Sequence, residues 1–160
     1  MSASSAETFT TTDRRCVSLR RAVPADHETI ATLLRGLDLP TEGVSEWLDH
    51  FWIAEHQGQV VGVAGMERYG DSGLLRSVAV TPAWRSTGIG RTLVERVLEE
   101  GRTNGVREVY LLTTTAEQYF PRLGFACVDR ACVPVALHAS AEFTGACPDS
   151  AVVMRRAATR

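Results

Sequence analysis

One stretch, residues 74–104, constrains the fold of this chain more than any other. It opens with a β-rich apolar run, residues 74–80, which predicts a buried strand. The run ends at Thr81-Pro82, because proline cannot donate to a strand ladder. A glycine-containing loop follows, and apolar residues then recur at helical spacing at Leu93, Val94, Val97 and Leu98. The sequence therefore predicts a strand, a glycine loop and an amphipathic helix in direct succession.

This succession favours a phosphate site. A loop that leads into a helix presents backbone N–H groups at the positive end of the helix dipole. The P-loop pattern is absent, because no Gly-Lys-Ser/Thr sequence follows Gly88 and Gly90. The dinucleotide fingerprint is absent too, because Leu93 stands where its third glycine would be. What remains is Arg-x-x-Gly-x-Gly, from Arg85 to Gly90, after a strand that ends in Val-Ala-Val-x-Pro.

This combined pattern resembles the acetyl-CoA motif of the GNAT superfamily of N-acetyltransferases. The resemblance implies that loop amides hold the CoA pyrophosphate and that the preceding strand holds the pantetheine arm through backbone hydrogen bonds. Acetyl-CoA is therefore the expected co-substrate, and no metal is expected. The cofactor-binding residues implied by the resemblance are Val78, Ala79, Val80, Arg85, Ser86, Thr87, Gly88, Ile89, Gly90, Arg91, Thr113 and Phe120.

Length and composition predict one globular domain. The chain has 160 residues with 44% hydrophobic content, and its net charge of −2 suggests neither a nucleic-acid nor a membrane partner. Residues 1–14 are rich in Ser, Thr and Ala without an apolar core, so we expect a disordered tail rather than a signal peptide. The expected GNAT domain is residues 15–156, followed by a tail at 157–160, and the expected compartment is the cytoplasm.

The remaining patterns predict an α/β fold. Strands are expected at residues 16–20, 51–56, 59–66, 106–112, 123–128 and 150–156, with a hairpin turn at Gln57-Gly58. Helices are expected from Pro24 to Leu37, after a Ser45 cap, and from Ala116 to Arg122. This order resembles the GNAT fold, in which a mixed, mostly antiparallel sheet of six to seven strands splays at its centre to admit CoA and is flanked by about four helices.

Residues 113–125 resemble a second GNAT signature, Asn-x-x-Ala-x-x-Phe-Tyr-x-x-x-Gly-Phe. Thr113 stands at the asparagine, which in the family contacts the pantetheine. Phe120 stands at the tyrosine, which in the family often protonates the departing thiolate. Tyr119 lies one position earlier, on a different face of the expected helix, and is interpreted as a packing residue. The usual general acid is therefore missing.

The central strand departs from the family pattern as well. Many relatives carry a glutamate base at the position of Leu74, and the nearest carboxylate here is Glu67, which is either the base or a solvated turn residue. Arg76 is a charge in an apolar strand, so it either binds an acceptor carboxylate or forms a structural salt bridge, for instance with Glu67. A backbone N–H at Val80 is expected to polarise the thioester carbonyl. Glu67 and Thr114 are further candidates for acceptor binding.

Four segments narrow the resemblance to the N-acetyltransferases encoded in arsenic-resistance operons; they are residues 75–80, 111–117, 119–120 and 147–151. The Leu-Thr-Thr stretch and Phe120 are also similar to the acetyltransferase domain of N-acetylglutamate synthases. Both resemblances imply a small amino-acid-like acceptor. An arsenic context raises the possibility that Cys127, Cys132 and Cys147 form a thiolate site, although isolated cysteines are more often small buried hydrophobic residues.

These patterns predict an enzyme that transfers an acetyl group from acetyl-CoA to the amine of a small amino-acid-like molecule, by direct attack in a ternary complex. Its partner is a small-molecule amine, and it is expected to be a monomer or a homodimer. The resemblance to arsenic-operon enzymes implies a link to arsenic or xenobiotic resistance. Two alternatives stay open. One is a protein or peptide N-acetyltransferase, and the other is a non-catalytic sensor of acyl-CoA or arsenicals, which the missing tyrosine and glutamate suggest.

Overall fold

The computed structural model describes residues 6–158 and divides into two compact units. The first unit runs up to Gly65 and includes Ser77–Val97. The second comprises Met66–Arg76 and the chain from Leu98 onward.

The strands form a mixed sheet, as the sequence predicts. The order is β1-β2-β3-β4-β5-β6-β8-β7. The β5–β6 pair is parallel, whereas the β1–β2, β2–β3, β3–β4, β6–β8 and β7–β8 pairs are antiparallel. The strands are β1 (Glu7–Thr10), β2 (Cys16–Arg21), β3 (Phe51–His56), β4 (Gln59–Tyr69), β5 (Ser72–Val80), β6 (Glu108–Thr113), β7 (Ala126–Cys127) and β8 (Val152–Ala157).

The α-helices are α1 (His27–Gly36), α2 (Val44–Trp47) and α3 (Ile89–Thr103). A 3-10 turn, Pro24–Asp26, leads into α1, with proline at a position where its missing N–H costs nothing. The buried residues of α1 lie three or four positions apart, at Ile30, Ala31 and Leu34, as an amphipathic helix requires. No helix in residues 6–158 combines the length and the apolar character needed to cross a membrane.

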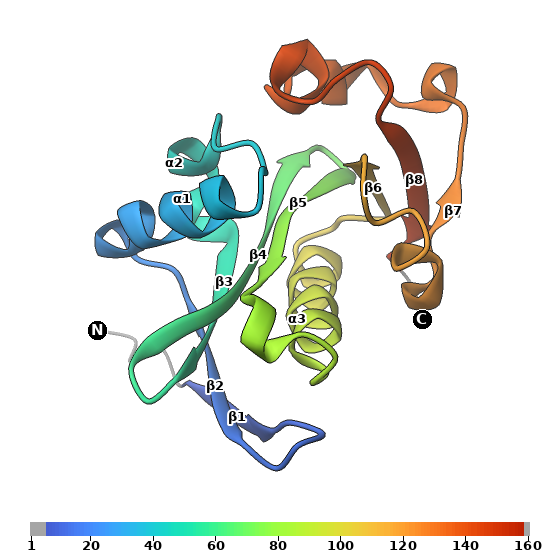
Figure 1. Cartoon of the computed structure of the whole chain (residues 1–160). Helices are drawn as coiled ribbons and strands as arrows, with labels where there is room; N and C mark the ends of the chain where they lie inside the picture. Colours follow the sequence, from blue (N-terminus) through green and yellow to red (C-terminus); the bar gives the residue numbers. More distant parts are fainter. Residues whose placement is uncertain (1–5, 159–160) are drawn as a thin grey trace. The chain divides into compact units, whose positions relative to one another are not determined.

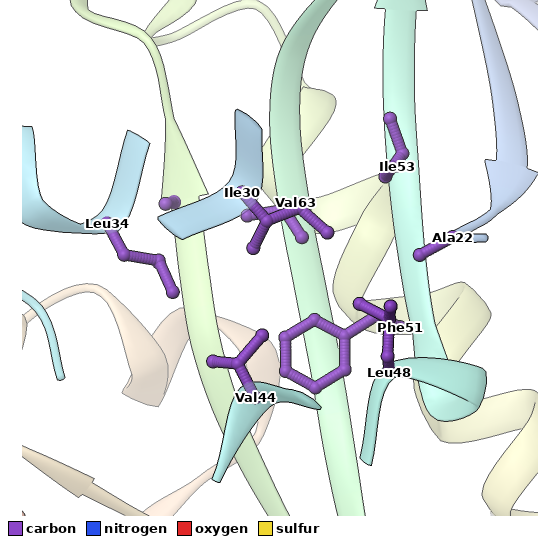
Figure 2. Packing of buried hydrophobic residues seen from close by; sticks show 9 residues of the cluster. Ala22, Ile30, Leu34, Val44, Leu48, Phe51, Ile53 and Val63 are labelled. Atoms are coloured by element: carbon purple, nitrogen blue, oxygen red, sulfur yellow. The ribbon is translucent and has the colours of Figure 1, made fainter. Parts of the chain in front are cut away.

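The core of the first unit lies between α1, α2 and strands β3 and β4. Figure 2 shows Ile30 and Val44 pointing from the helices toward Val63 and Phe51. Phe51 is fully buried and packs against Gly65, where an added Cβ would lie 2.3 Å from its ring. A residue larger than glycine would therefore displace that ring.

The opposite face of β4 packs against α3. An added Cβ at Gly62 would lie 3.0 Å from both Ile89 and Leu93 of that helix. Because successive strand residues point to opposite faces, Gly62 faces α3 while Val63 faces α1. Figure 1 shows the same arrangement, with α1 and α2 on one side of β3 and β4 and α3 on the other. The beginning of α3 is therefore fixed by apolar packing.

The second unit has its own core, formed by Leu74, Tyr110, Val133, Leu137 and Val153. The parallel ladder pairs Ser72–Leu74 of β5 with Glu108–Tyr110 of β6. This ladder involves three of the nine residues of β5, so the pairing with β6 stops before the end of β5.

The expected tail at residues 1–14 was wrong for Glu7–Thr10, which form β1 and pair with Cys16–Leu19 of β2. With β1, the sheet formed by residues 6–158 has eight strands, one more than the upper bound expected. Pairing with β2 orders this segment, although its Ser- and Thr-rich composition is typical of a disordered tail. Residues 1–5 and 159–160 lie outside the described residues, and the single domain at 15–156 stays a prediction.

Two helix predictions need correction. The helix expected from Ala116 to Arg122 is replaced by a 3-10 turn, Phe120–Leu123, because Pro121 cannot donate an intrahelical hydrogen bond. Ser45 lies inside α2 rather than at its cap, and the cap residue is Gly43 with a φ of 83°. The Gln57-Gly58 turn was predicted correctly, since its two residues have positive φ angles of 51° and 77°.

Candidate functional site

The glycine loop leaves β5 through a 3-10 turn, Pro82–Trp84, and leads directly into α3. Two of its residues adopt left-handed backbone conformations, Ser86 with a φ of 62° and Gly88 with a φ of 91°. The Thr87 hydroxyl is buried and donates a hydrogen bond to the Trp84 carbonyl oxygen over 2.6 Å. The loop is therefore a folded turn that is closed by its own side chain.

The N-terminus of α3 presents the donors that a phosphate requires. The Thr92 N–H bonds the Gly88 carbonyl oxygen over 3.1 Å, and the Thr92 hydroxyl donates to the same oxygen over 2.8 Å. N–H groups that precede this first helical bond have no partner within the helix. An added Cβ at Gly88 would meet no atom within 4 Å, so the space beside it is open. Open space next to helix N–H groups suits an anion.

The loop is anchored in the first unit. Ile89 and Leu93 are fully buried, and the Trp84 ring lies 4.7 Å from the His56 ring, measured between centroids. Most of the residues expected to bind the cofactor lie close together in the chain. Three of them end β5: Val78, Ala79 and Val80. The turn and the start of α3 carry seven more: Arg85, Ser86, Thr87, Gly88, Ile89, Gly90 and Arg91. Their contact with a cofactor stays a prediction.

A buried charge cluster lies in the second unit. The Arg76 Nη1 donates to Glu67 Oε2 over 2.7 Å, and the Arg76 Nε lies 3.7 Å from Glu142 Oε2. The exposed fractions of the Arg76, Glu67 and Glu142 side chains are 0%, 1% and 5%. The ion pair with Glu67 that the sequence suggested for Arg76 is therefore present, and acceptor binding by Arg76 stays a prediction. Glu67 is not the solvated turn residue of the other interpretation.

Two hydroxyl groups complete this charge cluster. The Tyr69 hydroxyl donates to Glu67 Oε1 over 2.5 Å, and the Ser140 hydroxyl donates to Glu67 Oε2 over 3.1 Å. Burial and the neighbouring Glu67 carboxylate raise the pKa of Tyr69 above its ordinary value, so the phenol stays protonated and remains a donor. The Glu67 carboxylate therefore accepts three hydrogen bonds, one of them from a cation.

Comparison with known proteins decides which family these features belong to. A family model described as an acetyltransferase (GNAT) domain matches residues 47–127, which include β3, β4, β5 and α3. The chain belongs to the GNAT acetyltransferase family. An N-acetyltransferase of Chlorobaculum tepidum is 31% identical over 124 residues, which cover 72% of this chain and 79% of that protein.

Two further relatives of this GNAT chain are named for amino-acid substrates. An amino-acid acetyltransferase of Mycobacterium tuberculosis is 39% identical over 84 residues, covering 50% of this chain and 48% of that protein. The match thus spans about half the length of that relative. The N-acetylglutamate synthase of Neisseria gonorrhoeae, solved with coenzyme A and N-acetyl-glutamate, superimposes with a TM-score of 0.79 at 24% identity, covering 90% of this chain and 35% of that one. At that identity, the similarity shows the GNAT fold. None of these three relatives carries an arsenic-related name, so that likeness stays a prediction.

The second GNAT signature takes a different local form in the second unit. The Thr113 hydroxyl, at the end of β6, accepts a hydrogen bond from the Ala116 N–H over 2.9 Å. Phe120 is buried and lies edge-on to Tyr119 and Phe125, at centroid distances of 5.3 and 5.9 Å. The Tyr119–Phe120 contact agrees with the packing interpretation of Tyr119. Thr114 is exposed and follows β6 directly. Roles for Thr113, Thr114 and Phe120 in binding stay predictions.

Sequence reasoning missed three members of the charge cluster, Tyr69, Ser140 and Glu142. Ser140 lies 73 positions from Glu67, so no local spacing could have linked them. Two signals were usable. Tyr69 lies two positions from Glu67 on one strand and therefore on the same face, and Glu142 is a carboxylate between Ala141 and Phe143.

The cysteines do not have the buried positions expected of packing residues. Cys16, Cys127 and Cys132 are exposed, and Cys147 is partly exposed. Within the described part of the chain, no group of three or more His, Cys, Asp or Glu side chains is placed to hold a metal ion. The expectation that three thiolates could converge is therefore not met there.

Proposed function

We propose that this GNAT chain transfers an acetyl group from acetyl-CoA to the amine of a small amino-acid-like acceptor. The observation that carries the proposal is the folded loop at residues 85–90. It leads into α3 and leaves unoccupied space beside Gly88. The names of the relatives support the acceptor class, because two of them act on amino acids or glutamate. Because the matches cover only 48% and 35% of those two relatives, the acceptor class is part of the proposal.

The loop fits the phosphate groups of CoA. The positive φ at Ser86 and Gly88 turns the chain tightly, and the helix N–H groups ahead of Thr92 supply donors at the positive end of the dipole. A Cβ at Gly88 would fill the open space beside the backbone and would be strained at a φ of 91°. We therefore assign pyrophosphate binding to this turn and pantetheine binding to the extended backbone of Val78–Val80.

When bound, acetyl-CoA supplies an acetyl group activated as a thioester with a thiolate leaving group. The residues of the chain need to orient the acceptor amine, polarise the carbonyl and take up one proton. We assign the polarisation to a backbone N–H at Val80, as in an oxyanion hole. We assign the proton to Glu67, through water because its side chain is 1% exposed. Holding both substrates in position supplies much of the remaining acceleration.

A screen tests this function. The purified chain is incubated with acetyl-CoA and a panel of free amino acids that includes glutamate, and CoA thiol release is corrected for hydrolysis. Acetylation of at least one amino acid is the expected result. The panel also contains organoarsenical amino acids, because the arsenic-resistance likeness predicts them, and a set of peptides. Acetylation confined to peptides would replace the proposed acceptor class, and CoA binding without any turnover would indicate a sensor.

Gly90→Val tests the assignment of the phosphate turn. A Val side chain at the second helix position would intrude on a bound pyrophosphate, so CoA affinity is expected to fall by about tenfold or more, a cost of ~1.4 kcal/mol. Calorimetry with CoA measures this change. The matched control is Gly36→Val, another helical glycine, where an added Cβ meets no atom within 4 Å. A folded Gly90→Val variant with the CoA affinity of the parent protein would refute the assignment.

A further inference from the structure

We propose that the N-terminal hairpin, residues 7–15, is a brace that holds the phosphate loop in its binding conformation, with Thr12 and Arg15 as positioning residues. The proposal rests on the CoA-binding role given to the loop above. It adds a function to a segment that lies outside the matched GNAT region, which begins at residue 47. All of the contacts that carry it lie within the first unit.

Thr12 fixes the orientation of two peptide groups in the loop. Its N–H donates to the Thr87 carbonyl oxygen over 3.2 Å, and its hydroxyl donates to the Ser86 carbonyl oxygen over 3.4 Å. In a trans peptide the carbonyl oxygen and the following N–H point in opposite directions. With both carbonyl oxygens turned toward the hairpin, the N–H groups of Thr87 and Gly88 point away from it. The hairpin thus directs donors toward the side on which a phosphate would bind.

Arg15 holds the beginning of the loop. Its guanidinium carbon lies 3.4 Å from the centroid of the Trp84 ring, and its Nη2 donates to the Ala83 carbonyl oxygen over 3.4 Å. Asp13 orients the guanidinium from the other side through an Nη2–Oδ2 distance of 2.5 Å. The Trp84 carbonyl oxygen accepts the hydrogen bond that closes the turn, from the Thr87 hydroxyl. Arg15 therefore positions a residue on which the loop closure depends.

A third contact connects the hairpin to α3. The Glu7 Oε1 of β1 lies 3.2 Å from the Arg96 Nε, and the Arg96 guanidinium carbon lies 4.1 Å from the centroid of the Trp52 ring. The hairpin thus contacts both the loop and the helix that together form the phosphate turn. Figure 1 shows β1 beside β2 at the lower end of the view.

The expected consequence is a change in CoA affinity without a change in chemistry. A loop that samples other conformations binds in proportion to its competent fraction, so loss of the brace lowers apparent affinity. Because the proton transfer and the acceptor do not depend on this contact, kcat and the acceptor KM should stay within about twofold of the parent values. A rise in acetyl-CoA KM alone is the signature of positioning.

The test compares Arg15→Ala with Arg14→Ala, which removes the same charge from the adjacent, exposed residue. From the sizes of stacking and hydrogen-bond contributions, Arg15→Ala is expected to weaken CoA binding about three- to tenfold in calorimetry. Arg14→Ala is expected to change it by less than about twofold. Amide hydrogen exchange of residues 86–90 in the absence of CoA should be faster in Arg15→Ala alone.

Two further variants separate bracing from other effects. Arg15→Lys keeps the charge but loses the flat stacking group, so full recovery of CoA affinity would indicate charge attraction and overturn the brace. Thr12→Val removes only the hydroxyl contact with Ser86 and is expected to weaken binding by about twofold even if Arg15→Ala folds poorly. A parent chain that fails to bind CoA would refute the proposed function. A parent that binds CoA, with Arg15→Ala equal to Arg14→Ala, would refute the brace alone.

Discussion

Two arginines in this protein each lie between two carboxylates, but in different settings. In the first unit, Arg20 bonds both oxygens of Asp26, over 2.7 and 2.8 Å, and its Nε bonds Glu55. In the second unit, Arg76 bonds Glu67 and lies beside Glu142. The Arg20 side chain is 27% exposed, whereas the Arg76 side chain is 0% exposed.

The difference lies in what each cluster contributes. Water still reaches Arg20, so its pairs are screened and each contributes modestly. The charged side chains of the Arg76 cluster are at most 5% exposed, so the buried charges depend mainly on one another for compensation. A buried ion pair is weak evidence for stability, but it requires the segments that carry its residues to pack in one particular way. Here it fixes Ser140 and Glu142 against strands β4 and β5 of the second unit.

Arg76→Met should produce the largest effect, because it leaves the Glu67 and Glu142 carboxylates buried without their cation. We expect a loss of about 3–5 kcal/mol in the free energy of unfolding. Urea denaturation measures it. The matched control is Arg102→Met, which breaks an exposed pair with Glu99 and is expected to cost about 0.5 kcal/mol or less.

A combined variant sharpens this result. Adding Glu67→Gln to Arg76→Met removes one stranded charge, so part of the lost stability should return. If Arg76→Met costs no more than Arg102→Met, water reaches the Arg76 cluster, and the contrast with Arg20 disappears.

The same contrast shows how much the sequence could predict. The Arg20–Asp26 ion pair lies at the entry to the first helix, and its partners are only six positions apart in the sequence. A pairing over so short a distance lies within the reach of a local sequence pattern. The glycine loop could be predicted for the same reason, because the strand, the turn and the helix follow one another directly in the sequence.

What the sequence could not predict depends on distant partners. Ser140 lies 73 positions from its partner Glu67, Glu142 is similarly distant from Arg76 in the sequence, and no periodicity marks these contacts. β1 was missed because its order comes from pairing with β2 rather than from its composition. The helix after β6 was overpredicted, because Pro121 outweighed the helical spacing around it.

Asp26→Asn should produce an intermediate effect. The Asp26 carboxylate accepts two bonds from Arg20 and one from the Val23 N–H over 2.7 Å, which also caps the turn before α1. Asparagine keeps the shape but loses the charge, so we expect a cost of about 2 kcal/mol in unfolding free energy. Asp49→Asn removes the same charge from an exposed residue and serves as the control.

The effect of Asp26→Asn should depend on pH. The Arg20 guanidinium holds the pKa of Asp26 below its usual range. A carboxylate whose pKa is lowered in the folded state contributes stability above its unfolded pKa, about 3.9, and loses that contribution as pH falls toward the lower folded value. The difference between parent and variant should therefore be constant from about pH 5 to 8 and should shrink below about pH 4. A difference that persists unchanged at pH 2.5 would show that the Asp26 charge is not its source.

The smallest effect concerns two tyrosines that have the same local arrangement. Tyr69 bonds Glu67 over 2.5 Å and Tyr110 bonds Glu108 over 3.0 Å, each from two positions along its strand. The carboxylate is buried in the first pair, whereas the Glu108 side chain is 39% exposed. Tyr69→Phe is expected to cost about 1–2 kcal/mol in unfolding free energy, because Glu67 keeps Arg76 and Ser140 but loses its third donor while its side chain is only 1% exposed. Tyr110→Phe is expected to cost about 0.5 kcal/mol or less, because water can take the place of the phenol at Glu108. Urea denaturation of both variants measures the difference, and equal costs would mean that burial of the carboxylate does not set the value of the hydrogen bond.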